Sequence, residues 1–316
     1  MDMITSKQRL LYTFVATTLL SLAGCGSSGS GGKTGTLSLG ISDGPAHDAV
    51  KVCIAFDEIE FKGEGAPFTV DPGGIQNINL LDFQGANAAP LLFNEELPAG
   101  NYQWMRLGVN AVMGGTGGNG DDASTSLCAG DASYLAIDPD KGGTIHNLYV
   151  PSGAQSGLKL VSGFTVPVNG SADFTAEIDL MKSLTAPPGL SPDVVFRPTI
   201  RLVNNVEVGT LVGDVSSDLA TAEACEPSVF VFDDGVSPNA IGTDADPAEY
   251  DPNDPIATAM VSAQVVNEET TYSYTVGFLL AGDYEVAFTC DGSTFEPVDG
   301  KPATIVAKEV ETVSFP

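Results

Sequence analysis

Short runs in which apolar and polar residues alternate recur along this chain from residue 35 onward. Residues 36–41 alternate in this way, and so do residues 50–56, which continue into an apolar run ending at Phe61. A period of two places side chains on opposite faces of a β-strand. The runs are separated by Gly, Asn, Asp and Pro at intervals of about ten residues, which is typical of β-sandwiches. The pattern predicts an all-β protein.

The expected strands fall into two groups. The first group is residues 36–41, 50–61, 75–83, 102–113, 134–137, 145–150, 164–168, 174–180 and 199–206. The second group is residues 209–215, 229–232, 260–266, 271–280, 284–290 and 303–315. Residues 233–255 lie between two strands of the second group and form an acidic, proline-rich segment of unusual length for a loop.

The two groups share short sequence features. Each opens on Gly-Thr-Leu, at residues 35–37 and 209–211. Each later contains an Ala-Gly-Asn or Ala-Gly-Asp turn that leads into a tyrosine, Tyr102 or Tyr284. Such turns suit hairpins because Gly, Asn and Asp tolerate positive φ. We therefore expect two tandem β-sandwich domains, residues 35–206 and 207–316. The alternative is that all-β chains share such turns by chance.

The N-terminus has the pattern of a secretory signal. Lys7 and Arg9 precede the apolar residues 10–22, which are too few to span a bilayer, and Leu-Ala-Gly-Cys ends at Cys25. This arrangement resembles the lipobox of bacterial lipoproteins, which implies a signal peptide over residues 1–24 and a lipid on Cys25. The alternative is an ordinary secretory signal with a chance cysteine. Residues 25–34 read as a lipidated cysteine and a flexible Gly/Ser linker.

Gly26, the residue after Cys25, bears on which bacterial membrane would hold the protein. In two-membrane bacteria an aspartate after the lipidated cysteine often signals retention at the inner membrane, and here the residue is glycine. The resemblance therefore implies an outer-membrane lipoprotein that faces either the periplasm or the cell exterior.

The charge of the chain excludes one class of partner. It contains 13 Lys and Arg against 41 Asp and Glu, a net charge of −28, and removal of residues 1–24 leaves −29. Affinity for nucleic acid comes mainly from cations that neutralise phosphates, so nucleic acid is not an expected partner. Anionic lipid headgroups would also repel this surface. Attachment to a membrane must then come from the lipid on Cys25.

Four cysteines remain after Cys25, and two of them fall in each half. The cell envelope is oxidising, so we expect disulfides Cys53–Cys128 and Cys225–Cys290. Four cysteines allow three connectivities, and this pairing depends on the domain assignment alone. A zinc site is the rival interpretation, but the chain has no C-x-x-C motif and only two histidines.

Several ordered motifs resemble a known family. They are Leu-Gly-Ile-Ser-Asp-Gly-Pro at residues 39–45, Val-Pro-Ser-Gly-Ala-Gln-Ser-Gly-Leu-Lys-Leu at residues 150–160 and Phe-Arg-Pro-Thr-Ile-Arg-Leu at residues 196–202. Residues 35–205 thus look like the envelope lipoproteins of the domain of unknown function 4382 family. The resemblance implies an immunoglobulin-like or prealbumin-like sandwich and no reaction. The second unit is similar to prealbumin-like or carboxypeptidase-regulatory-like modules.

The sequence offers no recognisable catalytic arrangement. Ser156 lacks the spacing of a nucleophile elbow, and neither His47 nor His146 lies in a triad-like setting. Paired carboxylates occur readily among so many acidic residues, so such pairs in the sequence are not evidence of a glycosidase site. We expect no catalytic residues and a protein that is not an enzyme. An envelope hydrolase or processing enzyme that uses carboxylates is the alternative.

Calcium is the one cofactor the sequence suggests, because flexible loops with many hard oxygen donors suit its variable coordination. The candidate ligands in the acidic loop are Asp233, Asp234, Asp244, Asp246, Asp251 and Asp254. A second candidate ion site combines Asp43 and Asp48 with Asp57 and Glu58. A merely solvated acidic loop is the alternative to the first site.

The remaining hypothesis is a binding or structural module. Trp104 and Tyr102 lie on one face of a predicted strand, and exposed aromatic rings stack on sugars, although a sole tryptophan more often fills a sandwich core. Loops on a rigid scaffold commonly carry binding activity. We expect a non-enzymatic, membrane-tethered lipoprotein that recognises an extracellular glycan or an envelope protein.

Overall fold

The computed structural model describes residues 32–46, 48–118, 121, 125, 127–151, 157–185, 193–239 and 253–316. Within this part of the chain, Lys33–Pro316 forms one compact unit. The signal peptide, Cys25 and nearly all of the linker lie outside the described residues, as do His47 and Ser156. The expectations about them therefore stay predictions.

The first half of the chain forms fifteen strands and three short helical turns within the described residues. They are β1 Thr34–Asp43, β2 Ala49–Lys62, β3 Phe68–Val70, β4 Gln76–Asn79, η1 Leu80–Phe83, β5 Ala89–Pro98, β6 Gly100–Tyr102, β7 Trp104–Val109, β8 Tyr134–Ile137, η2 Pro139–Lys141, β9 Ile145–Tyr149, β10 Leu158–Leu160, β11 Phe164–Val166, β12 Ser171–Asp179, α1 Leu180–Ser183, β13 Leu184–Thr185, β14 Val194–Phe196 and β15 Thr199–Asn204.

The second half contributes eight more strands and one helical turn within the same described ranges. They are β16 Val208–Val215, α2 Ser217–Ala220, β17 Ser228–Asp233, β18 Ala257–Met260, β19 Ser262–Val266, β20 Glu269–Leu280, β21 Gly282–Thr289, β22 Phe295–Ile305 and β23 Val310–Thr312.

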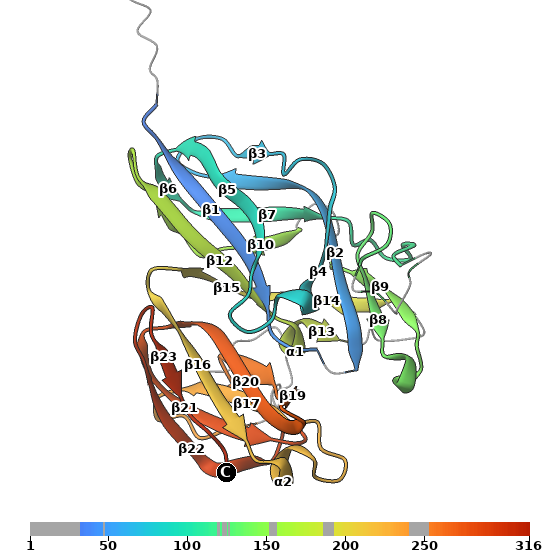
Figure 1. The fold of residues 1–316 in the computed structure, drawn as a ribbon. Helices are drawn as coiled ribbons and strands as arrows, with labels where there is room; N and C mark the ends of the chain where they lie inside the picture. Colours follow the sequence, from blue (N-terminus) through green and yellow to red (C-terminus); the bar gives the residue numbers. More distant parts are fainter. Residues whose placement is uncertain are drawn as a thin grey trace, which may run out of the picture. The chain divides into compact units, whose positions relative to one another are not determined.

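Two main sheets enclose the core of the first sandwich (Figure 1). One has the order β15-β12-β1-β5, and the other has the order β10-β7-β2-β8-β9-β14-β13, with β3 and β4 also paired to β2. The central strand β1 runs parallel to β12 and antiparallel to β5. Apolar side chains from both sheets form one continuous buried cluster.

Strand β1 shows how the sequence pattern produces this packing. Leu37, Leu39 and Ile41 are each 1% exposed and point to the same face, because successive side chains of a strand alternate. Asp43 occupies the next position of that face and is also buried. The amphipathic pattern of β1 therefore ends on a buried carboxyl group.

The second sandwich consists of two four-stranded sheets. Their orders are β19-β20-β16-β23 and β18-β17-β21-β22, and no strand of the first half joins them within the described residues. Their apolar faces enclose a separate core that includes Leu211, Val229 and Val286. Two packed four-stranded sheets fit the prealbumin-like sandwich that we expected for this half.

The structure confirms an all-β fold built of tandem β-sandwiches, but some expected strand boundaries were wrong. Residues 75–83 do not form one strand, because the Asn79 side chain accepts a hydrogen bond from the Leu81 N–H and a helical turn begins there. Strand β5 was missed because apolar residues recur irregularly in Ala89–Pro98. Residues 102–113 contain only the end of β6 and the strand β7, which stops at Val109.

Both expected disulfides are present. Cys53 is joined to Cys128 and Cys225 to Cys290, with Cα–Cα distances of 5.8 Å and 4.5 Å. The pairing within halves is therefore confirmed. Disulfides persist in oxidising compartments such as the bacterial periplasm and the cell surface.

Candidate functional site

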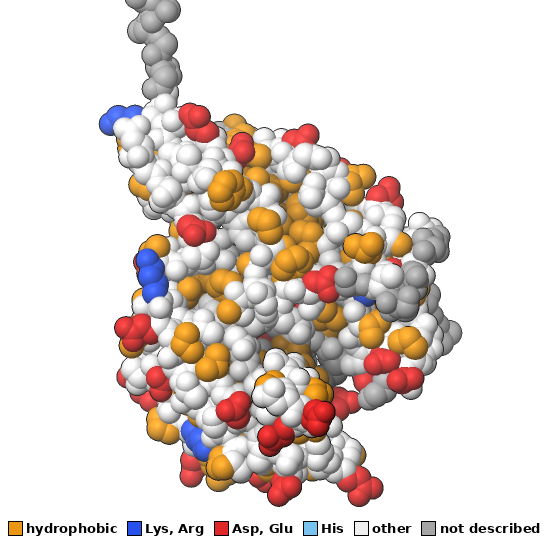
Figure 2. Space-filling model, viewed as in Figure 1, with side chains coloured by type: hydrophobic (Ala, Val, Ile, Leu, Met, Phe, Trp, Pro, Cys, Tyr) orange, Lys and Arg blue, Asp and Glu red, His pale blue; other side chains and the backbone are white. Residues whose placement is uncertain are grey.

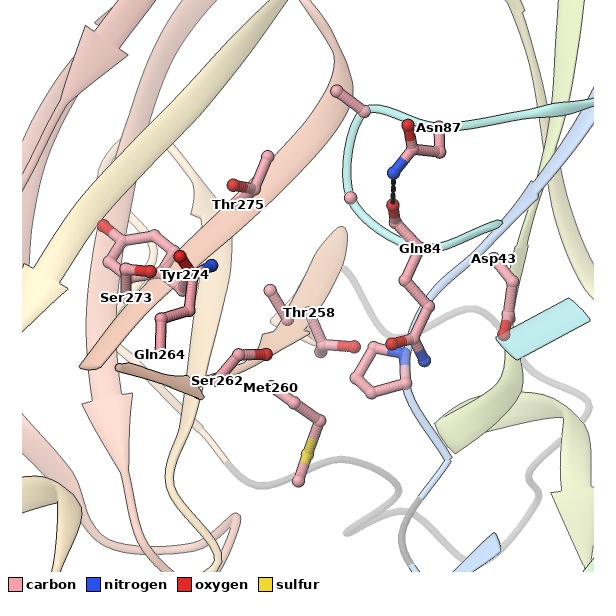
Figure 3. A pocket seen from close by; sticks show the side chains of 14 residues that line it. Asp43, Gln84, Asn87, Thr258, Met260, Ser262, Gln264, Ser273, Tyr274 and Thr275 are labelled. Carbon is pink, nitrogen blue, oxygen red and sulfur yellow. Dashed lines mark hydrogen bonds between the residues drawn. The ribbon is translucent and has the colours of Figure 1, made fainter. Parts of the chain in front are cut away.

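A polar cleft of about 360 Å³ opens at the C-terminal end of β1 (Figure 3). One wall is the loop after η1, residues 84–87, and the other is formed by β18, β19 and β20. Each wall comes from a different sandwich. The cleft has the size of a small-molecule site.

Close backbone packing holds the two walls together. A Cβ atom on Gly277 of β20 would lie 2.4 Å from the carbonyl oxygen of Gly85 and 2.7 Å from the Cα of Ala86. A Cβ atom on Gly85 would lie 3.3 Å from the Thr275 side chain, and Gly85 also has a positive φ of 67°. The loop can approach β20 this closely because both positions are glycine.

Amide and hydroxyl groups make up most of the polar lining. Gln84 and Asn87 come from the loop, and Thr258, Gln264 and Ser273 come from the second sandwich. The Asn87 side chain donates a 3.2 Å hydrogen bond to the backbone carbonyl of Gln84, which fixes the loop (Figure 3). The Thr258 hydroxyl is buried and has no hydrogen-bond partner among the described residues.

Asp43 is the one charged side chain among the described residues that line the cleft. It is 2% exposed, and neither carboxylate oxygen has a hydrogen-bond partner in the described ranges. Desolvation raises its pKa well above the ordinary value, and the charges of Asp179 and Glu177 raise it further. The backbone N–H groups of Leu180 and Gly44 lie near the carboxyl group but outside hydrogen-bond geometry, and they oppose this shift only in part. The Gly44 N–H donates instead to the Ile178 carbonyl.

A cluster of charged groups lies beside the cleft. The Glu177 carboxylate pairs with the Arg201 guanidinium, and burial nevertheless raises the pKa of Glu177 to about 7. Burial also raises the pKa of Asp179, against the lowering effect of Lys182 and Arg201. These groups line a second cavity of about 290 Å³ that adjoins Gly44 and Thr258.

The ammonium group of Lys182 is engaged with the segment that leads into β18. It donates a hydrogen bond to the backbone carbonyl of Pro255, and it lies 3.9 Å from the Asp254 carboxylate. Asp254 is thus held by a lysine in the first sandwich.

The structure describes only part of the expected calcium loop, and the calcium site stays a prediction. Asp233 ends β17 and Asp234 follows it, whereas Asp254 lies beside Lys182. Asp244, Asp246 and Asp251 lie outside the described residues. Across the described ranges, no group of three or more His, Cys, Asp or Glu side chains is placed to hold a metal ion.

The second candidate ion site is divided between two places. Asp43 lines the cleft, whereas Asp57 and Glu58 line a different hollow of about 230 Å³ together with Asp131. Asp48 is exposed and lines neither of them. The sequence drew attention to Asp43 but assigned it the wrong neighbours. Gln84 and Thr258, which line the same cleft, carry no signal of their own in the sequence.

Two other residues singled out from the sequence have local roles. His146 is partly buried in β9, and its Nε2 lies 2.9 Å from the Thr144 hydroxyl. Trp104 was expected in the core but is only partly buried, with the Lys159 ammonium 4.6 Å from its ring centroid. Its exposed face is therefore engaged in a cation–π contact.

The charged side chains of this protein are predominantly acidic. Figure 2 shows acidic side chains scattered over the face drawn, with few basic ones among them. In the ranges described above, no helix is both long enough and apolar enough to cross a membrane.

The fold and cleft define an all-β protein of tandem sandwiches with a polar cleft between loop 84–87 and the strands of the second sandwich. The chain belongs to the family described as "Domain of unknown function (DUF4382)", whose model matches residues 34–198. The family resemblance inferred from the motifs is confirmed over that range. No match was found among curated proteins.

Solved structures show only distant likeness. A leucine-rich repeat protein from Bacteroides thetaiotaomicron is 14% identical, with 90% of this chain and 26% of that chain covered and a TM-score of 0.22. GBS52, the minor pilin of Streptococcus agalactiae, is 11% identical, with 89% and 94% covered and a TM-score of 0.20. The chain thus spans about a quarter of the former protein. Scores this low carry no argument about function.

Proposed function

We propose that this protein is a non-enzymatic, envelope-anchored lipoprotein that binds a glycan in the cleft beside Asp43. The observation that carries the proposal is the lining of the cleft. It combines amides, hydroxyls and one buried carboxyl group that has no hydrogen-bond partner among the described residues. Sugar hydroxyls both donate and accept hydrogen bonds, so such a lining can satisfy them.

The proposed location follows from the N-terminal sequence and the disulfides. A lipid on Cys25 would anchor the chain to the outer membrane, and the residues between Cys25 and the start of β1 at Thr34 would act as a tether. The two disulfides fit an oxidising compartment. The net charge of −28 leaves the lipid as the source of membrane affinity and argues against nucleic acid as a partner.

A glycan array probed with the compact unit, residues 33–316, tests this function in the presence and absence of millimolar calcium. We expect a defined set of glycans to bind and Gln84→Ala to weaken that binding. Gln103→Ala is the matched control, because Gln103 is exposed and does not line the cleft. If no glycan binds in either condition, the proposal fails. Binding only with calcium would instead support the acidic-loop ion site.

One observation favours the hydrolase alternative. The pKa of Glu177 is raised to about 7, which suits a general acid. Glu177 is nevertheless paired with Arg201 and lines the second cavity, whereas Asp43 lines the cleft. We expect glycans that bind the protein to be recovered intact after prolonged incubation. Cleavage products that disappear in Glu177→Gln would establish the alternative.

A further inference from the structure

Asp43 has no counter-charge in the cleft that it lines. The other described lining residues are uncharged, and both oxygens of its carboxyl group lack hydrogen-bond partners within the described part of the chain. An unpaired charge is costly to bury, so a buried carboxyl group either keeps its proton or acquires a cation. A ligand that bound only the neutral amides and hydroxyls of the cleft would leave the buried carboxyl group of Asp43 without a counter-charge.

We propose that the ligand is a glycan that carries a free ammonium group, an amino sugar, and that this ammonium pairs with Asp43. The inference rests on the proposed glycan-binding function and specifies the class of glycan. The amides of Gln84 and Gln264 and the hydroxyl of Thr258 would serve the sugar hydroxyls around it.

The neighbouring cations are not available to neutralise Asp43. Arg201 pairs with Glu177, and Lys182 is engaged with the Pro255 carbonyl and Asp254. The remaining titratable group in this cluster is Asp179, which is acidic like Asp43 and Glu177. A cation that enters the cleft therefore meets an excess of negative charge.

An ammonium group suits this site better than a metal ion. No cluster of three carboxylate, imidazole or thiolate side chains suitable for a metal occurs in the described residues. An ammonium needs one carboxylate as its counter-charge, and its other N–H donors can bond to neutral oxygens. The lining supplies one carboxyl group together with amide and hydroxyl oxygens.

Binding should be linked to proton release. In the empty cleft, burial and the charges of Asp179 and Glu177 favour the protonated form of Asp43. An ammonium beside the carboxylate favours the ionised form, so the proton of Asp43 leaves as the ligand binds. Affinity for the amino sugar should consequently increase with pH while the ligand amine stays protonated.

The test compares two oligosaccharides that differ only at the amine, oligomers of glucosamine and of N-acetylglucosamine, by titration calorimetry. We expect the glucosamine oligomer to bind at least about tenfold more tightly, as for a hydrogen bond to a charged group. In Asp43→Asn, which preserves the size of the side chain, this preference should vanish. Wild-type titrations in buffers of different ionisation enthalpy should show proton release.

The outcomes separate the two proposals. Equal affinity for both oligomers, unchanged in Asp43→Asn, overturns the amino-sugar assignment and leaves glycan binding in place. Binding of neutral glycans alone on the array also overturns it. If no glycan binds the protein, both proposals fail. If Asp43→Asn does not fold, the wild-type buffer series still decides, because no proton release contradicts the pairing of the ammonium with Asp43.

Discussion

Tyr102 and Tyr284 make the same hydrogen bond in the two sandwiches. The Tyr102 hydroxyl donates to the carbonyl of Pro98 at 2.7 Å, and the Tyr284 hydroxyl donates to the carbonyl of Leu280 at 2.8 Å. In both cases the acceptor lies four residues earlier, across the Ala-Gly-Asn or Ala-Gly-Asp turn. The shared sequence feature thus corresponds to a shared structural device that ties a turn to the strand after it.

Removal of either hydroxyl should destabilise its sandwich. Tyr102→Phe and Tyr284→Phe each lose one hydrogen bond and leave a carbonyl without that partner, at a cost of about 1 kcal/mol. The midpoint of urea unfolding, measured by fluorescence or circular dichroism, should fall for both variants. Tyr272→Phe is the control, since no hydrogen bond of its hydroxyl is seen among the described residues. An unchanged midpoint in both variants would show that the bond contributes nothing.

The repeats and cysteines show how much of the fold could be predicted from the sequence. Alternation of apolar and polar residues, as in β1, identified most strands, because burial of one face imposes a period of two. The turns that contain Gly and Asn marked where many of these strands end. The assignment of two cysteines to each half of the chain predicted both disulfides correctly. Strand β5 and the turn at Asn79 were not predictable from alternation, since one has an irregular apolar pattern and the other depends on a side-chain cap.

Lys51 forms a buried ion pair that should be important for stability. Its ammonium is 2.8 Å from Asp121 Oδ1, with the two side chains 1% and 0% exposed, and the Tyr134 hydroxyl donates to the same oxygen at 2.6 Å. Lys51→Met leaves Asp121 buried without that cation, which should cost about 3–5 kcal/mol. Urea unfolding should show this loss, whereas Lys33→Met, at an exposed lysine, should change little.

A double variant distinguishes the pair from simple packing. Lys51→Met with Asp121→Leu removes both charges, so we expect it to recover part of the stability that Lys51→Met loses. If the double variant loses as much as the sum of the two single variants, the charges are not coupled.

The contact between loop 84–87 and β20 should be sensitive to one methyl group. Gly277→Ala would place a Cβ atom within 2.4 Å of the Gly85 carbonyl oxygen, so the loop must move. We expect a loss on the order of 1–3 kcal/mol in the free energy of unfolding, and weaker binding in the cleft. Gly65→Ala is the matched control, because its Cβ would meet nothing within 4 Å. Equal thermal melting of the two variants would contradict this packing.

The buried acids predict how stability depends on pH. Burial raises the pKa of Glu177 from 4.5 to about 7, so the folded state binds more protons than the unfolded state between these values. The free energy of unfolding should therefore fall as pH rises through this window, with a slope from Glu177 of at most about 1.4 kcal/mol per pH unit. The raised pKa values of Asp43 and Asp179 act in the same direction.

Urea unfolding at a series of pH values from about 4 to about 8, on either side of the ordinary and raised pKa of Glu177, measures this slope. Glu177→Gln should make the slope shallower, whereas Glu96→Gln, at an exposed position, should leave it unchanged. An identical slope in wild type and Glu177→Gln would show that Glu177 does not titrate at a raised pKa in the folded protein.

The cleft was less predictable than the fold. Asp43 could be singled out as the polar residue that ends the apolar face of β1, yet its neighbours come from a loop and from strands more than two hundred residues later. Proximity of this kind arises from the packing of two sandwiches, which no local pattern records. The raised pKa of Asp43 likewise depends on burial that only the folded chain creates.

Strand β1 also determines how a pulling force would pass through the protein. It begins at Thr34, directly after the proposed tether, and ends at Asp43 in the cleft. If the lipid on Cys25 holds the protein while a bound glycan is pulled, the part of the load that Asp43 carries enters and leaves through the two ends of this one strand. The ladders of β1 with β12 and β5 would then be loaded in shear, with many hydrogen bonds sharing the force at once.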